Sequence, residues 1–206
     1  MTAVMVAIWQ VFPKPGGKML KGDVLRPEHL LRFFLIGLCW VVGTCWVASV
    51  RSETITFANG TVLLEPPPGF LPLSDQVKAI KFPRGNTPTA VIGNESASTT
   101  IAYGLRPREI RQQDMEAARK VFTKVFSRVL PGLQFKENKV VDLAGQRWGY
   151  MEMTSNAVDT DIYNIVVFTG HQGKTLILNF NSTRGDFPKY EQALRKSISS
   201  LQLITK

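Results

Sequence analysis

An uncharged apolar run from Phe33 to Val50 constrains this chain more than any other feature. It reads FFLIGLCWVVGTCWVASV, with Arg32 directly before it and Arg51 directly after it. As a helix rising ~1.5 Å per residue, the run spans about 27 Å, close to the ~30 Å hydrocarbon layer of a bilayer. The core helix of a soluble protein normally keeps a polar stripe, whereas this run is apolar on every side. Residues 33–50 are therefore predicted to be a membrane-targeting segment.

The segment is either a cleaved signal peptide or a retained transmembrane anchor, and both alternatives stay open. The small residues Ala48 and Ser49 favour cleavage, whereas the length of the run favours an anchor. Basic residues precede the run, which places residues 1–32 on the cytoplasmic side and residues 53–206 on the far side of the membrane. This basic stretch is long for a signal peptide, so Met19 is an alternative candidate for the start of translation.

The exported domain, residues 53–206, contains no cysteine, because Cys39 and Cys45 both lie in the apolar run. It can form no disulfide and offers no thiolate to a metal, and an exported domain without disulfides favours a bacterial protein. The domain has 19 basic and 14 acidic residues, a net charge of +5. This mild excess favours an anionic neighbour such as a lipid surface and gives little support for nucleic-acid binding.

The pattern of the exported domain predicts an α+β fold with a single antiparallel sheet and helices packed on it. A hairpin is expected around Asn59-Gly60, a strong turn signal. Later strands have connections too short for parallel crossovers, so they are expected to form an antiparallel meander. Asp186 is expected to cap the last helix, and residues 83–96 are expected to be a loop. Strands are predicted at 54–57, 61–64, 98–103, 134–143, 146–155, 162–168 and 175–181, and helices at 75–82, 107–130 and 187–201.

The outward face of the middle helix carries four basic residues: Arg111, Lys120, Lys124 and Arg128. One interpretation is a contact surface for an anionic partner or a lipid headgroup layer. The alternative is an ordinary solvated helix face, which is the commoner meaning of a charge run.

The common catalytic motifs are missing from the sequence of the exported domain. Its one histidine, His171, is expected to be a solvated turn residue, and the chain has no hydrolase nucleophile elbow, Walker loop or dinucleotide fingerprint. Asp159 and Asp161 are the best local candidates for calcium ligands, but a polar loop explains them better. We therefore expect no enzyme activity, no cofactor and no metal.

Acidic residues leave one catalytic alternative, a carboxylate-based hydrolase. Glu152 is its strongest candidate, because it lies within a predicted strand among aromatic and methionine residues. One interpretation is a partly buried carboxyl with a raised pKa; the alternative, commoner for such residues, is a position at a strand edge or on an outer face. Other acids could meet it in space, namely Glu53, Glu65, Glu109, Glu116 and Glu137.

The order of elements resembles the DcrB-like and PsbP-like group of domains. The resemblance rests on a hairpin with a proline-glycine exit, a single long middle helix, an aromatic strand start and a short C-terminal motif. These features lie at Phe57–Gly60, Pro67–Phe70, Ala144–Trp148, Phe187–Tyr190 and Ser199–Leu201. The resemblance implies a PsbP-like α/β/α sandwich and an exported bacterial protein of poorly defined role, and it supplies no catalytic residues.

Together these features predict a noncatalytic envelope protein in the bacterial periplasm, either soluble after cleavage or anchored to the inner membrane by residues 33–50. The leading hypothesis is an accessory or scaffold domain that binds an envelope protein not identified by the sequence. The alternatives are a protein that binds a lipid surface or a small ligand and, third, the carboxylate hydrolase.

Overall fold

The computed structural model describes residues 53–82, 87–157 and 160–204, all within one compact unit. The predicted targeting segment at 33–50, the region 1–32 that precedes it and both cysteines lie outside the described residues. Within the described ranges, no helix is both long enough and apolar enough to cross a membrane.

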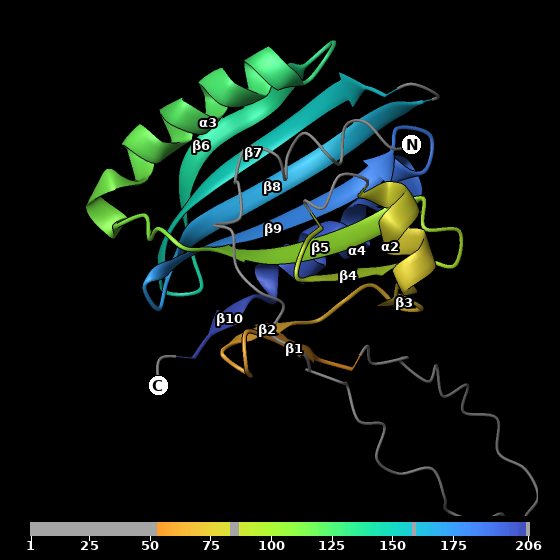
Figure 1. Cartoon of the computed structure of the whole chain (residues 1–206), viewed down its shortest axis with the longest axis horizontal. Coiled ribbons are helices and arrows are strands. Elements are labelled where there is room, and N and C mark those ends of the chain that lie inside the picture. Colours follow the sequence, from red (N-terminus) through yellow and green to blue (C-terminus); the bar gives the residue numbers. More distant parts are fainter. Residues whose placement is uncertain (1–52, 83–86, 158–159, 205–206) are drawn as a thin grey trace, which may run out of the picture. The chain divides into compact units, whose positions relative to one another are not determined.

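A seven-stranded antiparallel sheet forms the centre of the domain (Figure 1). The predicted meander is confirmed, and two of its turns, at Ala144-Gly145 and Gln172-Gly173, have positive φ at both residues. This is the backbone that type I′ hairpin turns require. In spatial order the strands are β3 (Leu71–Pro72), β4 (Ala90–Gly93), β5 (Thr99–Arg106), β9 (Lys174–Thr183), β8 (Asp161–His171), β7 (Gln146–Asn156) and β6 (Gln134–Leu143).

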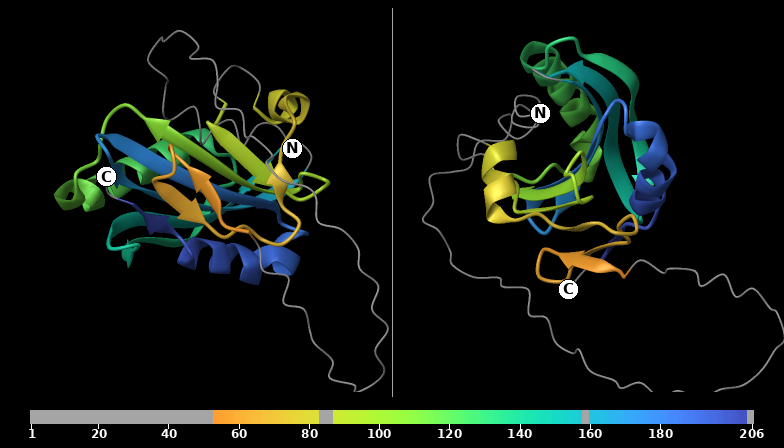
Figure 2. Two further views of the ribbon diagram at one scale, coloured as in Figure 1. Left: turned by 90° about the horizontal axis from the view of Figure 1, so that it is seen from below. Right: turned by 90° about the vertical axis from the view of Figure 1, so that its right-hand side faces the viewer.

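Alternating residues of the central strands face two separate apolar layers. On β7, Met151 and Met153 pack in the layer of helix α3 (Met115–Val129), whereas Trp148 packs in the layer of helix α4 (Phe187–Ser199). The two helices lie on opposite sides of the sheet (Figure 2). The expected α+β fold, an antiparallel sheet between packed helices, is confirmed. At the start of α4, however, the Asp186 side chain makes no capping hydrogen bond, contrary to expectation.

The middle helix begins later than predicted. The pattern indicated a helix over 107–130, but α3 begins at Met115, after the short 3-10 turn η2 (Gln112–Asp114). The segment before η2 is held at the end of the sheet instead, because the Thr175 hydroxyl of β9 donates a hydrogen bond to the carbonyl oxygen of Arg108. This tertiary contact outweighs the local helical pattern.

The edge of the sheet lies partly in a stretch that was predicted to be a loop. Helix α2 (Asp75–Lys81) matches its prediction closely, but β4 falls within 83–96. This short strand is recognisable only from its pairing with β5, where Ile92 lies opposite Ile101. Its sequence neighbours are rich in turn-forming residues, which hid it from a pattern-based prediction.

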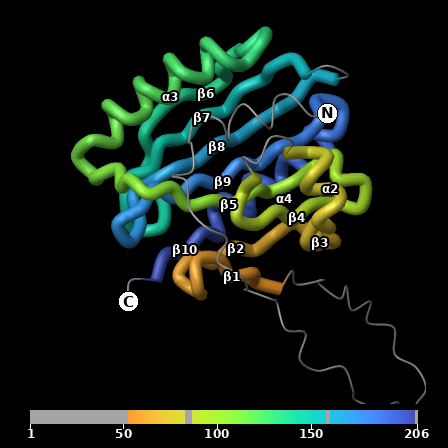
Figure 3. The backbone as a smooth tube through the Cα atoms, in the orientation of Figure 1, coloured from red at the N-terminus to blue at the C-terminus, as the bar shows by residue number. Residues whose placement is uncertain are grey.

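A second, three-stranded sheet joins the two ends of the domain, whereas the sequence pattern predicted a single sheet. It contains the predicted hairpin, β1 (Ile55–Phe57) and β2 (Val62–Leu64), and adds β10 (Gln202–Leu203) beside β2 (Figure 3). Val62 and Leu64 are fully buried in the α4 layer of the core. The small sheet is therefore part of the packed domain.

Candidate functional site

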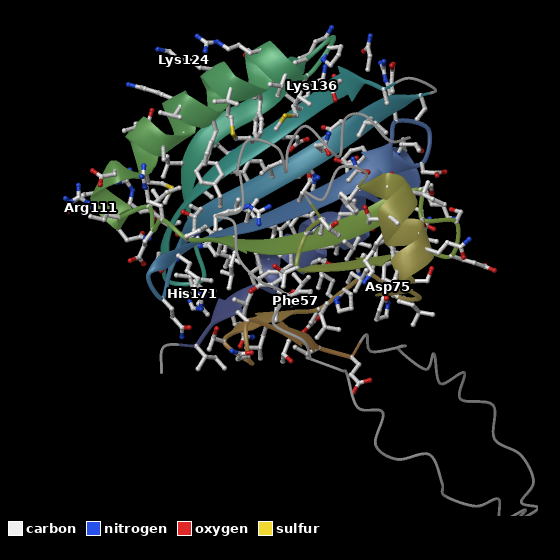
Figure 4. All side chains as sticks on the ribbon, viewed as in Figure 1. Phe57, Asp75, Arg111, Lys124, Lys136 and His171 are labelled. Carbon is white, nitrogen blue, oxygen red and sulfur yellow. The ribbon has the colours of Figure 1, made fainter. Side chains whose placement is uncertain are left out.

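Helix α3 presents three of the four predicted basic residues on one face. Phe122 and Phe126 pack inward against the sheet, while Lys120, Lys124 and Arg128 are exposed. Their four-residue spacing aligns them on one side of the helix, and Figure 4 shows Lys124 on the side turned away from the core. We call these three residues the α3 basic face.

Among the described residues, only Lys120 of the α3 basic face interacts electrostatically with a nearby acid, Glu116, and it does so without forming an ion pair. Within the described ranges, Lys120, Lys124 and Arg128 form no ion pair. The nearby acid Glu116 pairs instead with Arg119, whose Nη2 lies 2.5 Å from Glu116 Oε1. The hydrogen bond from Arg119 also holds the pKa of Glu116 below its usual value. Three cations therefore point to solvent together.

An exposed aliphatic side chain lies beside these cations. Val121 keeps 55% of its surface exposed, and at about 100° per residue it lies roughly 20° from Arg128 and 60° from Lys124 around the helix. Cationic side chains beside exposed aliphatic ones are typical of surfaces that rest on anionic lipid.

Arg111, the fourth predicted residue, does not belong to the helix face. It precedes η2, and its Nε donates a hydrogen bond of 2.6 Å to Asp114 Oδ2, which neutralises its charge locally. In its place the structure adds Lys136, an exposed residue at a bulge in β6 on the same side of the molecule as Lys124 (Figure 4). A bulge depends on pairing with the next strand, so strand alternation alone does not reveal it.

Glu152, the predicted catalytic candidate, is buried and fully bonded. It lies on the α4 side of β7 with only 3% of its surface exposed. Arg195 of α4 donates to both of its oxygens, from Nη2 to Oε1 at 2.8 Å and from Nη1 to Oε2 at 3.0 Å. The hydroxyl of Tyr150 donates to Oε2 at 2.9 Å, and the hydroxyl of Tyr163 donates to Oε1.

The interpretation that gave Glu152 a raised pKa was wrong. Burial raises the pKa of the Glu152 carboxyl, but the hydrogen bonds from Arg195, Tyr163 and Tyr150 outweigh burial and lower the pKa overall. A carboxylate held ionised by four donated hydrogen bonds is poorly suited to give or take a proton. Glu137 lies opposite it on β6, but pairs with Lys139 at 2.5 Å. This pair of acids therefore gives the hydrolase alternative no support.

His171 is buried rather than solvated, contrary to expectation. The strand β8 continues through His171, and only Gln172 and Gly173 form the turn. The ring Nε2 lies 2.9 Å from the hydroxyl of Thr61, which itself donates to the carbonyl oxygen of Ala58. The contact between the ring and the Thr61 hydroxyl joins the small sheet to the main sheet, with His171 at the end of β8 (Figure 4).

We expect the domain to lose stability below pH 6.5 through His171. Burial lowers the pKa of His171, although the nearby Glu109 partly opposes this. The unfolded chain therefore binds this proton more readily, so the contribution is complete above the ordinary pKa of about 6.5 and declines as the pH falls, with a slope of at most about 1.4 kcal/mol per pH unit. Urea unfolding at pH 5 to 7.5 measures this slope. The variant His171→Gln should flatten the curve, and an unchanged slope in that variant would contradict the assignment.

No metal centre is apparent in the described part of the chain. Across residues 53–82, 87–157 and 160–204, no three His, Cys, Asp or Glu side chains gather as a metal would need. Asp161 pairs with Arg184, whose Nη1 lies 3.2 Å from Asp161 Oδ2, and Asp159 lies outside the described residues.

Comparison with known proteins identifies the fold. No family model and no curated protein matches the chain. The solution structure of cyanobacterial PsbP from Synechocystis sp. PCC 6803 is similar, with a TM-score of 0.54 and 13% identity over 79% of this chain and 99% of that one. A crystal structure from Bacteroides thetaiotaomicron has a TM-score of 0.51 and 9% identity, over 76% of this chain and 50% of that one. A point mutant of Mog1 has a TM-score of 0.50 and 10% identity, over 75% of this chain and 96% of that one.

The domain therefore has a PsbP-like fold, as the resemblance implied. At these identities the likeness describes the fold alone, and the DcrB-like part of the resemblance stays a prediction.

Proposed function

We propose that this chain is a noncatalytic accessory protein of a bacterial envelope whose exported domain rests on an anionic lipid surface through α3. The α3 basic face carries this proposal, because Lys120, Lys124 and Arg128 point outward together, form no ion pair among the described residues and lie beside the exposed Val121. Residues 33–50 supply the export signal or the anchor.

The strength of such a contact suits a domain that is already close to a membrane. A Lys or Arg near an anionic surface contributes about 1 kcal/mol, so three contribute about 3 kcal/mol, or roughly a hundredfold in affinity. One weak signal alone gives only marginal membrane binding, and stable attachment takes two. A retained segment at residues 33–50 would be the first signal, and the α3 basic face the second.

The noncatalytic part of the proposal is supported by the bonding of Glu152. This buried acid is ionised and tied to Arg195, so its role is to hold α4 on the sheet. Two further acids that the hydrolase alternative named, Glu116 and Glu137, are each paired with a neighbouring cation.

Removal of the three charges should release α3 from the lipid surface. The full chain is reconstituted into vesicles of phosphatidylcholine with or without phosphatidylglycerol, and hydrogen exchange of the α3 amides is measured. We expect protection of α3 in the anionic vesicles at low salt, and its loss in the variant Lys120→Gln, Lys124→Gln, Arg128→Gln. High salt should have the same effect, because charges are screened over ~3 Å at 1 M.

A matched variant distinguishes the effect of the α3 basic face from the effect of the net charge of the domain. Lys174, Lys189 and Lys196 are exposed residues outside α3, and their replacement by Gln removes the same three charges. This control should keep the protection of α3. Equal loss in both variants would reduce the effect to net charge, and identical α3 exchange in neutral and anionic vesicles would reject the lipid contact. Protection that requires an added acidic protein would assign the face to a protein partner instead.

A further inference from the structure

A cavity of about 510 Å³ lies at the β3 edge of the main sheet, at the opposite edge from β6. Its lining comes from β3, the start of α2, the end of β4 and the loop that follows β4. Helix α2 lies beside this edge (Figure 1). The volume falls within the ~300–1,000 Å³ range that is typical of pockets for small ligands. We call this cavity the β3 pocket.

The lining of the β3 pocket is mostly apolar and partly open to solvent. Leu73, Val77 and Ala97 contribute half-buried or buried aliphatic surface. Leu71 also lines the pocket, yet it keeps 69% of its surface exposed, more than any other large apolar side chain among the described residues. An exposed large side chain at a pocket favours a bound partner that covers it.

Glu95 is the one charged residue among the described residues that line the β3 pocket. It is exposed, and it forms no ion pair within residues 53–82, 87–157 and 160–204. Lys78 of α2 does not neutralise it, because the Lys78 Nζ lies 2.6 Å from Asp75 Oδ1. The pocket therefore offers a bound group an apolar wall and a single carboxylate.

The loop that carries Glu95 is held in place by the side chain of Asn94. Asn94 Oδ1 accepts a hydrogen bond from the backbone N–H of Thr99 at 3.1 Å. Asn94 Nδ2 donates to Ser98 Oγ at 3.0 Å and to the Tyr190 hydroxyl at 3.2 Å. A carboxylate on a loop that is already ordered loses less conformational entropy when it binds a ligand.

We propose that the β3 pocket binds an arginine side chain that a partner protein presents. The alkyl stem of the arginine would contact Leu73 and Val77 while its guanidinium pairs with the Glu95 carboxylate. Long cationic side chains bind in this way, with their stems on apolar surface and their charge at its edge. Arginine fits better than lysine, because its guanidinium is more weakly hydrated and its planar fork matches a carboxylate.

The exposure of Leu71 favours a protein as the source of the cation. A free amino acid or a polyamine would leave most of the Leu71 side chain in water. Apolar residues beside an arginine in a protein would cover it and add the free energy of burying aliphatic surface.

This site is independent of the proposed lipid contact. β3 and β6 are opposite edges of the main sheet, and α3 contacts β6 and β7. The two sites also select opposite charges, because the β3 pocket would bind a cation and the α3 basic face an anion. The α3 charge variant should therefore keep peptide binding, and either proposal can fail alone.

A titration of the full chain in neutral phosphatidylcholine nanodiscs tests the proposal. The probe is the peptide N-acetyl-Leu-Arg-Leu-amide, and the readout is the backbone amide resonances of Gly69, Gly93 and Ala97. A matched peptide carries citrulline, which has nearly the shape of arginine but no charge. We expect saturable shifts with the arginine peptide. Binding should be about fivefold weaker for the citrulline peptide, and for the arginine peptide with the variant Glu95→Gln.

Two pairs of variants separate the pocket from general effects of charge and apolar surface. Asp142 is an exposed acid on β6, so Asp142→Asn removes the same charge as Glu95→Gln and should bind the peptide as the wild type does. Leu71→Asn should weaken binding about fivefold. Ile80→Asn makes the same kind of change at a side chain of α2 that is 63% exposed and outside the lining, and should leave binding unchanged.

A charge exchange tests direct contact between the arginine and Glu95. The variant Glu95→Arg should bind N-acetyl-Leu-Glu-Leu-amide more tightly than the arginine peptide. Four results would each overturn the proposal: no saturable shift with the arginine peptide, equal binding of the arginine and citrulline peptides, equal losses in Asp142→Asn and Glu95→Gln, or pocket shifts with octanoate but not with the peptide.

Discussion

We expect Arg195→Ala to lower the free energy of unfolding by about 3 kcal/mol. The variant leaves the Glu152 carboxylate, with 4% of its side chain exposed, without its counter-ion and without two hydrogen bonds. Breaking a buried pair by removing one partner typically costs ~3–5 kcal/mol, and the lower end applies here because the Arg195 side chain is 40% exposed. Guanidinium unfolding at pH 7 measures the loss.

Two further variants test whether the buried charge is the cause. Arg184→Ala removes an exposed pair with Asp161, whose side chains are 68% and 45% exposed, so it should lower stability by less than about 1 kcal/mol. Glu152→Gln combined with Arg195→Ala removes the unpaired charge and should recover part of the loss. Equal losses for Arg184→Ala and Arg195→Ala would refute the explanation.

The effect of Arg195→Ala should also depend on pH. In the folded domain the pKa of Glu152 is lowered, by hydrogen bonds that outweigh its burial. The stabilisation is therefore present above the ordinary glutamate pKa of about 4.3 and is lost as the pH falls through the folded value. The difference between wild type and Arg195→Ala should shrink below about pH 4. A difference that stays constant down to acid pH would mean that packing, rather than charge, is lost.

Elements whose residues follow a local pattern, such as the two-residue alternation of a strand, were predictable from the sequence. The bounds of β6 were predicted without error and those of β7 within one residue, because alternation and turn residues act locally. The basic residues of α3 were likewise found from their spacing. Arg111 was wrongly joined to them, because the sequence does not show that Arg108 is bonded to β9 before the helix begins.

Features that depend on distant partners were not predictable. Glu152 was recognised as unusual, but its pKa depends on Arg195, 43 residues later on another element. His171 is buried by contact with Thr61, 110 residues earlier. The buried side chains of Thr100, Asn181 and Asn164 form one row only because β9 lies between β5 and β8, an order that no local pattern shows. Contacts of this kind depend on the order of the strands in the sheet, and that order is set by packing between distant parts of the chain.

We expect Phe168→Ala to lower the free energy of unfolding by about 4 kcal/mol, from lost apolar contact and the cavity that remains. The Phe168 ring is fully buried on β8 and meets the ring of Phe122 edge-on, with centroids 4.4 Å apart. Its other side covers Gly149, its cross-strand neighbour on β7. Thermal or urea unfolding of the full chain measures the loss.

The opposite change at the same contact should also destabilise the domain. A Cβ at Gly149 would lie 2.0 Å from Phe168 Cζ, and the buried ring has no room to move, so Gly149→Ala should cost about 2 kcal/mol through overpacking. Glycine weakens an isolated strand, yet here it allows an aromatic ring to cover the backbone. If this is its role, Phe168→Leu should make space for the added methyl group. The double variant Gly149→Ala, Phe168→Leu would then be more stable than the sum of the two single losses, and additive losses would show that the ring and the glycine do not constrain each other.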